Sequence, residues 1–168
     1  MRGRKGFTII ETVMVLVIMG IMAVVTIIVI SNAMRGMQLS NAADKLVSDL
    51  RYAQTMANGI GKWYGISFEA TPSNIYTIYT TTGTIDTVVD NPGKRGSNFI
   101  VNVNSSFGVS ISSVTIEAGK KVEFNPLGTP YTDKTGTALS SEATVRFTLG
   151  SSSRTVRIAP GTGRVYIQ

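Results

Sequence analysis

An acidic residue within a long apolar segment near the N-terminus restricts this chain more than any other feature. Three basic residues and a glycine come first: Arg2, Arg4, Lys5 and Gly6. From 12 to 34 the chain then carries 23 consecutive uncharged residues. As a helix they would extend about 35 Å, enough to cross the apolar core of a bilayer. Glu11 lies at the start of this segment, where a carboxylate costs about 2.5–3.5 kcal/mol on insertion scales and usually marks a functional site.

The basic flank predicts the orientation of such a segment. Lysine and arginine next to a membrane helix stay on the cytoplasmic side, so the rest of the chain is expected outside. An ordinary secretory signal peptide or an uncleaved signal anchor would also explain a basic flank and an apolar run. Neither of these requires a Gly6-Phe7 junction followed by Glu11 at this spacing.

The residues Gly6-Phe7-Thr8-Ile9-Ile10-Glu11 resemble the class III signal of type IV prepilins and pseudopilins. The resemblance implies that a prepilin peptidase cuts between Gly6 and Phe7 and methylates the new amine of Phe7. Residues 1–6 would then be a leader, and the apolar helix would be retained. It also implies that Glu11, the fifth mature residue, pairs with the amine of a neighbouring subunit. This pairing on assembly would offset the free-energy cost of burying the carboxylate.

Composition argues against an enzyme. The 168 residues allow a membrane segment and one globular domain, and they include no cysteine and no histidine. The usual general bases, thiol nucleophiles and transition-metal ligands are therefore missing, and no cofactor or metal is expected. The net charge of +6 includes three charges in the leader, so 13 basic and 10 acidic residues remain after cleavage. The small excess of basic residues therefore says little about whether the chain binds nucleic acid.

A helical pattern continues beyond the apolar segment. Apolar residues recur at alternating spacings of four and three: Leu39, Ala43, Leu46, Leu50, Ala53 and Ala57. This is one face of a helix, and Asn58-Gly59 indicates its end. We therefore expect one helix over 7–58, half in the membrane and half packed on a sheet, with a short coiled coil as the alternative.

From residue 59 onward the pattern has a period of two. The expected strands are 62–68, 75–81, 98–103, 107–112, 114–117, 122–125, 143–149, 154–159 and 164–167. The stretches 82–97 and 128–141 are expected to be polar loops. So many short strands favour an antiparallel sandwich of two sheets over 59–168, and thus an α+β chain.

Two later segments narrow the resemblance. Val-Glu-Phe-Asn-Pro-Leu-Gly at 122–128 resembles the F-x-P-x-G turn of the GspH/FimT group of minor pseudopilins, and 154–165 resembles its closing hairpin. The resemblance implies a minor subunit of a type II secretion pseudopilus or a type IV pilus. It would sit in the bacterial inner membrane with its β-domain in the periplasm, and its partners would be prepilin peptidase and other pilin subunits.

The C-terminal strands carry exposed basic residues. If 143–149 and 154–159 form a hairpin around a four-residue loop, Arg146 faces Arg157, and a further turn places Tyr166 opposite Arg157, with Arg164 close by on that face. Opposed like charges destabilise a sheet, and an anionic partner would relieve the repulsion.

The resemblance suggests DNA as that partner, because some FimT-like subunits bind DNA through basic residues in this region. The C-terminal segment of those subunits resembles the pattern Gly-Arg-x-Arg, whereas in this chain Tyr166 replaces the second arginine. The alternative is that Arg146, Arg157 and Arg164 keep the sheet soluble and contact neighbouring subunits.

Overall fold

The structure is a computed structural model that describes residues 6, 8–117 and 119–168, without the side chains of 25–29. Most of the expected leader, residues 1–5, and the expected mature N-terminus Phe7 therefore lie outside the described residues. The chain forms two compact units, Met1–Gly36 and Met37–Gln168. Helix α1, Ile9–Ile60, contributes residues to both.

In the first unit the described apolar side chains of α1 are exposed; Ile9, for example, is 86% exposed and Leu16 is 64% exposed. Among the described residues, no helix combines the length and the apolar character needed to cross a membrane. The side chains of 25–29, which belong to the expected membrane segment, are outside the described part.

The second unit confirms the predicted helix face. All six residues of the predicted stripe, from Leu39 to Ala57, are at most 2% exposed. The helix ends where Gly61 takes a left-handed φ of 70° and its N–H bonds to the carbonyl of Ala57 at 3.1 Å. A glycine in this conformation is a common helix stop, because it lacks the Cβ that would clash.

In the described part of the chain, the strands form three antiparallel sheets. The six-stranded sheet contains β1 (Trp63–Glu69), β2 (Ile75–Thr81), β3 (Asp86–Val88), β6 (Ile100–Asn102), β8 (Lys121–Phe124) and β9 (Pro130–Tyr131). Its order is β3-β2-β1-β8-β9, and β6 also pairs with β2. The second sheet has the order β12-β11-β10-β7, built from β7 (Ser110–Thr115), β10 (Ala143–Leu149), β11 (Ser152–Ile158) and β12 (Val165–Ile167). A ribbon of β4 (Asp90–Asn91) and β5 (Lys94–Asn98) is the third.

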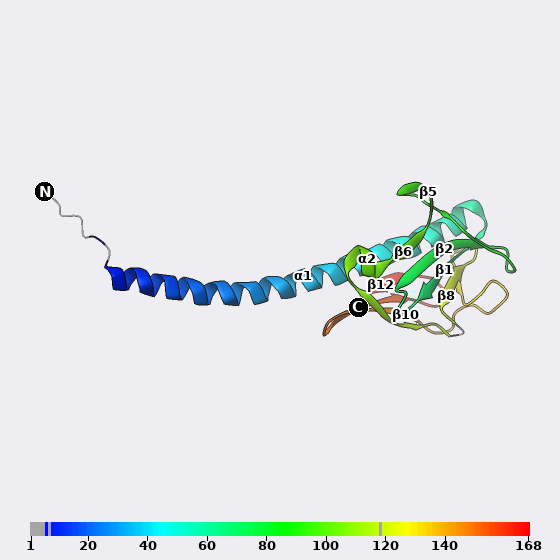
Figure 1. Cartoon of the computed structure of the whole chain (residues 1–168). Coiled ribbons are helices and arrows are strands. Elements are labelled where there is room, and N and C mark those ends of the chain that lie inside the picture. The colour runs from blue at the N-terminus through cyan, green and yellow to red at the C-terminus, as the bar shows by residue number, and fades with distance from the viewer. Residues whose placement is uncertain (1–5, 7, 118) are drawn as a thin grey trace. The chain divides into compact units, whose positions relative to one another are not determined.

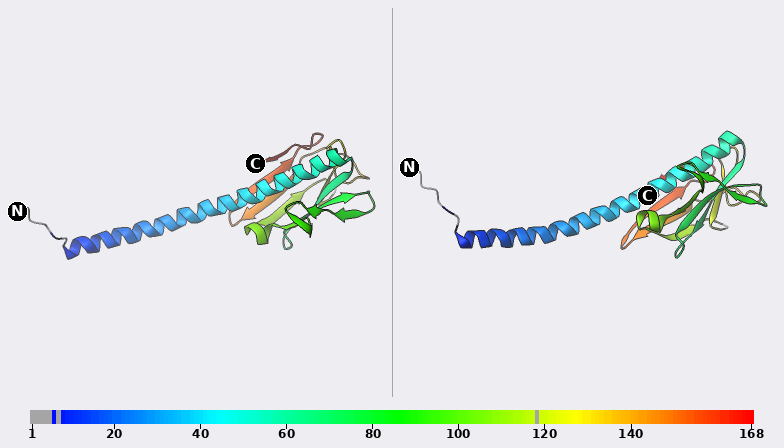
Figure 2. Two further views of the ribbon diagram at one scale, coloured as in Figure 1. Left: turned by 90° about the horizontal axis from the view of Figure 1, so that it is seen from above. Right: turned by 45° about the horizontal axis from the view of Figure 1, so that its top comes forward.

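One apolar core joins α1 to the two larger sheets. Leu46 and Leu50 of α1, Ile66 of β1, and Val145 and Phe147 of β10 are all fully buried in it. Figures 1 and 2 show the 37–60 part of α1 lying across these sheets. The expected α+β class, a long N-terminal helix followed by antiparallel sheets, is confirmed.

Local capping overrides the period-two pattern in one segment. The predicted strand at 107–112 begins instead with the end of helix α2 (Val103–Phe107) and continues as β7. The side chain of Asn102 accepts the N–H of Ser105 at 2.9 Å, and Gly108 ends the helix with a φ of 68°. The predicted loops 82–97 and 128–141 also contain short strands, β3, β4, β5 and β9.

Candidate assembly and ligand-binding sites

The N-terminal site is organised by Thr8, which the sequence reasoning did not single out. Its hydroxyl oxygen accepts the N–H of Glu11 at 3.3 Å, and its carbonyl accepts the N–H of Thr12 at 3.2 Å. Thr8 is thus the N-cap of α1, and Thr-x-x-Glu is the capping-box spacing that could have revealed it. The exposed Glu11 lies in the first turn, where a negative charge also favours the helix dipole.

The expected cleavage junction is described on one side only. Gly6 is exposed and lies outside any helix or strand, while Phe7 is outside the described residues. Among the described residues, no basic side chain forms an ion pair with Glu11.

The predicted opposition of Arg146 and Arg157 is wrong. In the structure Arg146 pairs with Thr155, and Arg157 pairs with Thr144. The hairpin closes in a two-residue turn, in which Gly150 has a φ of 61°, instead of the expected four-residue loop. Two-residue turns with positive φ match the twist of antiparallel strands, and this tighter turn shifts the pairing by two residues.

The predicted register between the last two strands is confirmed. Arg157 pairs with Tyr166 across β11 and β12, and Ile158 pairs with Val165. Arg146 and Arg157 are diagonal neighbours on the outward face, because Val145 and Val156 pair on the buried one. This separation removes the direct repulsion on which the expectation of an anionic partner partly rested.

Glu142 supplies a negative charge within the chain that the sequence reasoning missed. Its carboxylate forms an ion pair with Nη1 of Arg157 at 2.7 Å and accepts the hydroxyl of Tyr166. These bonds, that from Tyr166 first, hold the pKa of Glu142 below its ordinary value, and the bond to Glu142 raises the pKa of Tyr166. Glu142 precedes β10 in a loop, so no strand pattern could place it beside β11 and β12.

Arg157 and Arg164 differ in their exposure on this face. Among the described side chains, Nε of Arg157 is a buried nitrogen without a hydrogen-bond partner. Arg164 is exposed, between the buried Gly163 and Val165. Arg146 donates to the hydroxyl of Ser153 at 3.0 Å. The cluster of Glu142, Arg157, Arg164 and Tyr166 is therefore a mixed-charge surface rather than a purely basic one.

The two segments that carry the resemblance meet in space at Gln54. Nε2 of this α1 residue donates to the carbonyl of Gly128 at 2.9 Å and to that of Thr162 at 3.1 Å. A Cβ on Gly163 would lie 2.7 Å from the Gly128 carbonyl oxygen, so glycine alone fits there. The turns 125–129 and 160–163 are thus held against α1 as one unit.

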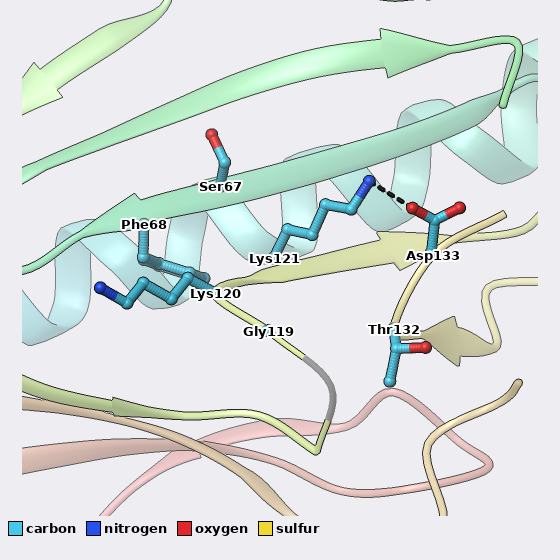
Figure 3. Close-up of a pocket in the computed structure, with 7 residues that line it drawn as sticks. All are labelled: Ser67, Phe68, Gly119, Lys120, Lys121, Thr132 and Asp133. Carbon is cyan, nitrogen blue, oxygen red and sulfur yellow. Dashed lines mark ion pairs between the residues drawn. The ribbon is translucent and has the colours of Figure 1, made fainter. Parts of the chain in front are cut away.

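A hollow of about 310 Å³ lies between β1, β8 and the loop after β9. Figure 3 shows Lys121 reaching across it to Asp133, with an Nζ–Oδ2 distance of 2.5 Å. Lys121 also lies 3.1 Å from the fully buried Glu123, which accepts the hydroxyl of Tyr79 at 2.8 Å and the N–H of Lys134 at 2.7 Å.

These contacts give the charged groups of the hollow a structural role. The bond from Lys121, followed by bonds from Thr135, lowers the pKa of Asp133 to about 2. Burial, and then the bond to Glu123, raise the pKa of Tyr79. The network anchors the loop 132–135 to the sheet.

Comparison with known proteins found matches to the N-terminal segment and to the fold. The prokaryotic N-terminal methylation motif matches residues 1–27. Two crystal forms of the type IV minor pilin FimU of Pseudomonas aeruginosa share the fold, each with a TM-score of 0.51 over 77% of this chain. They are 17% and 16% identical to it and are covered over 92% and 87% of their length. No curated protein matches. The chain therefore carries an N-terminal methylation motif and shares the fold of this minor pilin.

Proposed function

We propose that this chain is a minor pilin or pseudopilin of the GspH/FimT group, which acts by assembly and not by catalysis. The observation that carries the proposal is the N-terminal methylation motif over residues 1–27 on a chain with the fold of a minor pilin. The domain organisation follows from it: residues 1–6 form the leader, 7–58 the assembly helix and 59–168 the periplasmic domain.

The N-terminal helix gives this proposal a mechanism. Cleavage between Gly6 and Phe7 creates an amine, and the exposed Glu11 in the first turn of α1 provides the matching charge. Before assembly, the uncharged segment holds the subunit in the inner membrane as a single pass. On assembly, Glu11 pairs with the amine of the neighbouring subunit, and the apolar helices pack together.

The test compares the wild-type chain with Glu11→Ala and Gly6→Glu variants in a host that makes the corresponding filament. Mass spectrometry should find an N-methylated Phe7 in the wild type and in Glu11→Ala, but an uncut chain in Gly6→Glu. Glu11→Ala should remain in the membrane fraction and be lost from sheared filaments. Normal incorporation of Glu11→Ala would refute the proposed role of Glu11.

Two filament systems fit this proposal, and deletion phenotypes distinguish them. Loss of protein secretion would assign the chain to a type II secretion pseudopilus. Loss of surface pili or of twitching would assign it to a type IV pilus. In either case the membrane fraction should contain the precursor when prepilin peptidase is absent.

A second candidate function is DNA binding during uptake. It is favoured by the pairing of Arg157 with Tyr166 and by the exposed Arg164 next to them, since arginines contact phosphates and aromatic rings stack on bases. Glu142 opposes it, because its carboxylate already occupies Arg157 and Tyr166. The assembly proposal is therefore preferred.

The DNA candidate is tested with the full chain in detergent. Affinity for single- and double-stranded DNA should fall as salt rises, and it should fall further in an Arg157→Ala/Arg164→Ala variant. Absence of binding at low salt, or equal binding by the double variant, would remove this candidate.

A further inference from the structure

Leu127 is an exposed leucine at the tip of the turn that follows β8. Its side chain is 86% exposed, while the preceding Phe124 is fully buried. Turn positions of this kind usually carry polar residues or glycine. Because Leu127 is so exposed, it adds almost no buried apolar surface to its own domain.

The turn that carries Leu127 is rigid. Oδ1 of Asn125 accepts the N–H groups of Leu127 and Thr129, both at 2.9 Å. The backbone of Asn125 also bonds to Gly128 at 2.8 Å and to Thr129 at 3.1 Å. Pro126 fixes one further dihedral. Four hydrogen bonds therefore hold a five-residue turn, and the leucine side chain projects from a fixed base.

The same turn is attached to α1. Nε2 of Gln54 donates to the carbonyl of Gly128 at 2.9 Å, and a Cβ at Gly128 would lie 3.1 Å from Oδ1 of Asn58. Ile60, two residues beyond Asn58, is 49% exposed. Because these contacts fix the turn, Leu127 loses little conformational entropy when it docks, in contrast to a side chain on a mobile loop.

The three chain segments that meet beside the Leu127 turn carry charges of one sign. Three segments meet at Gln54 and Asn58, namely 51–62, 125–129 and 160–164. Together they contain three basic residues, Arg51, Lys62 and Arg164, and no acidic residue. All three basic residues are exposed.

We propose that Leu127 inserts into an apolar hollow rimmed by carboxylates on a neighbouring pilin-type subunit. The inference rests on the proposed assembly function and adds to it a contact in the globular domain, with a stated chemistry. A membrane surface is a poorer occupant, because a single leucine on a narrow turn offers too little apolar area for stable lipid binding. A protein pocket can enclose one side chain and offer carboxylates to Arg51, Lys62 and Arg164.

The test uses the full chain in a host that makes the filament and lacks the endogenous copy. Leu127→Glu should reduce the amount of subunit in sheared filaments about tenfold, the effect of losing one strong contact, at unchanged membrane abundance. Ile85→Glu is the matched control, because Ile85 is 65% exposed and lies in the turn between β2 and β3. It should assemble like the wild type.

A photoreactive phenylalanine analogue at position 127 identifies what the turn touches. The expected product is an adduct with a second protein that carries its own N-terminal methylation motif. An adduct with lipid alone, normal assembly of Leu127→Glu, or an equal loss in Ile85→Glu would each overturn the inference. Absence of the wild-type chain from filaments would overturn the proposed function, and this inference with it.

Discussion

The buried carboxylate of Glu123 allows a quantitative test of the folded domain. In a Glu123→Gln variant the side chain keeps its shape but loses its charge. It must then place an amide nitrogen, which cannot accept a hydrogen bond, beside Lys121 and Tyr79 or beside the N–H of Lys134. Each bond to a charged group contributes about 1.5–3 kcal/mol.

The size of the loss follows from what the partners retain. Breaking a buried ion pair costs about 3–5 kcal/mol, but the side chain of Lys121 is 33% exposed and keeps Asp133 at 2.5 Å. We therefore expect the free energy of unfolding to fall by about 2–3 kcal/mol, below that upper range.

The assay is equilibrium urea unfolding, followed by far-ultraviolet circular dichroism and by tryptophan fluorescence. Trp63 is the single tryptophan of the chain. Its ring lies 5.0 Å from that of Tyr131 and 5.9 Å from Nζ of Lys134, so it reports on the loop that Glu123 anchors. The control is Glu69→Gln at an exposed carboxylate. Equal midpoints for Glu123→Gln and the control would refute the reasoning.

Three further predictions concern stability. Leu46→Ala, at a fully buried position of α1, should lower the free energy of unfolding by about 2–5 kcal/mol in the same urea assay, and a loss under 1 kcal/mol would contradict the packing described. Gly163→Ala should destabilise more than Gly161→Ala, because both have positive φ but only the first would place a Cβ 2.7 Å from the Gly128 carbonyl; equal urea midpoints would contradict this contact. The pKa of Asp133 falls from 3.8 to about 2 on folding, so its contribution is present above pH 3.8 and is lost as the pH falls towards 2. Asp133→Asn should therefore flatten the loss of stability over that range, and an unchanged slope would contradict the ion pair.

Local patterns in the sequence were sufficient for the long helix, for the longer strands and for the buried face of α1. The stripe from Leu39 to Ala57 predicted the buried face of α1, and the period of two predicted the strand over 143–149, which is β10. These predictions hold because burial of apolar side chains imposes the period of each element on the chain. The N-terminal methylation motif over residues 1–27 could be recognised for a related reason, since it is contiguous in the sequence.

Only the tertiary structure decided the chemistry of the C-terminal face. The pairing of β10 with β11 depended on whether two or four residues form the turn, and both fit the alternation of apolar residues. Glu142 meets Arg157 because a loop brings it there, 15 residues away in the chain. Gln54 likewise joins two glycine turns, 74 and 108 residues distant. Contacts of this kind depend on how the elements pack together, and no local period of the sequence encodes them.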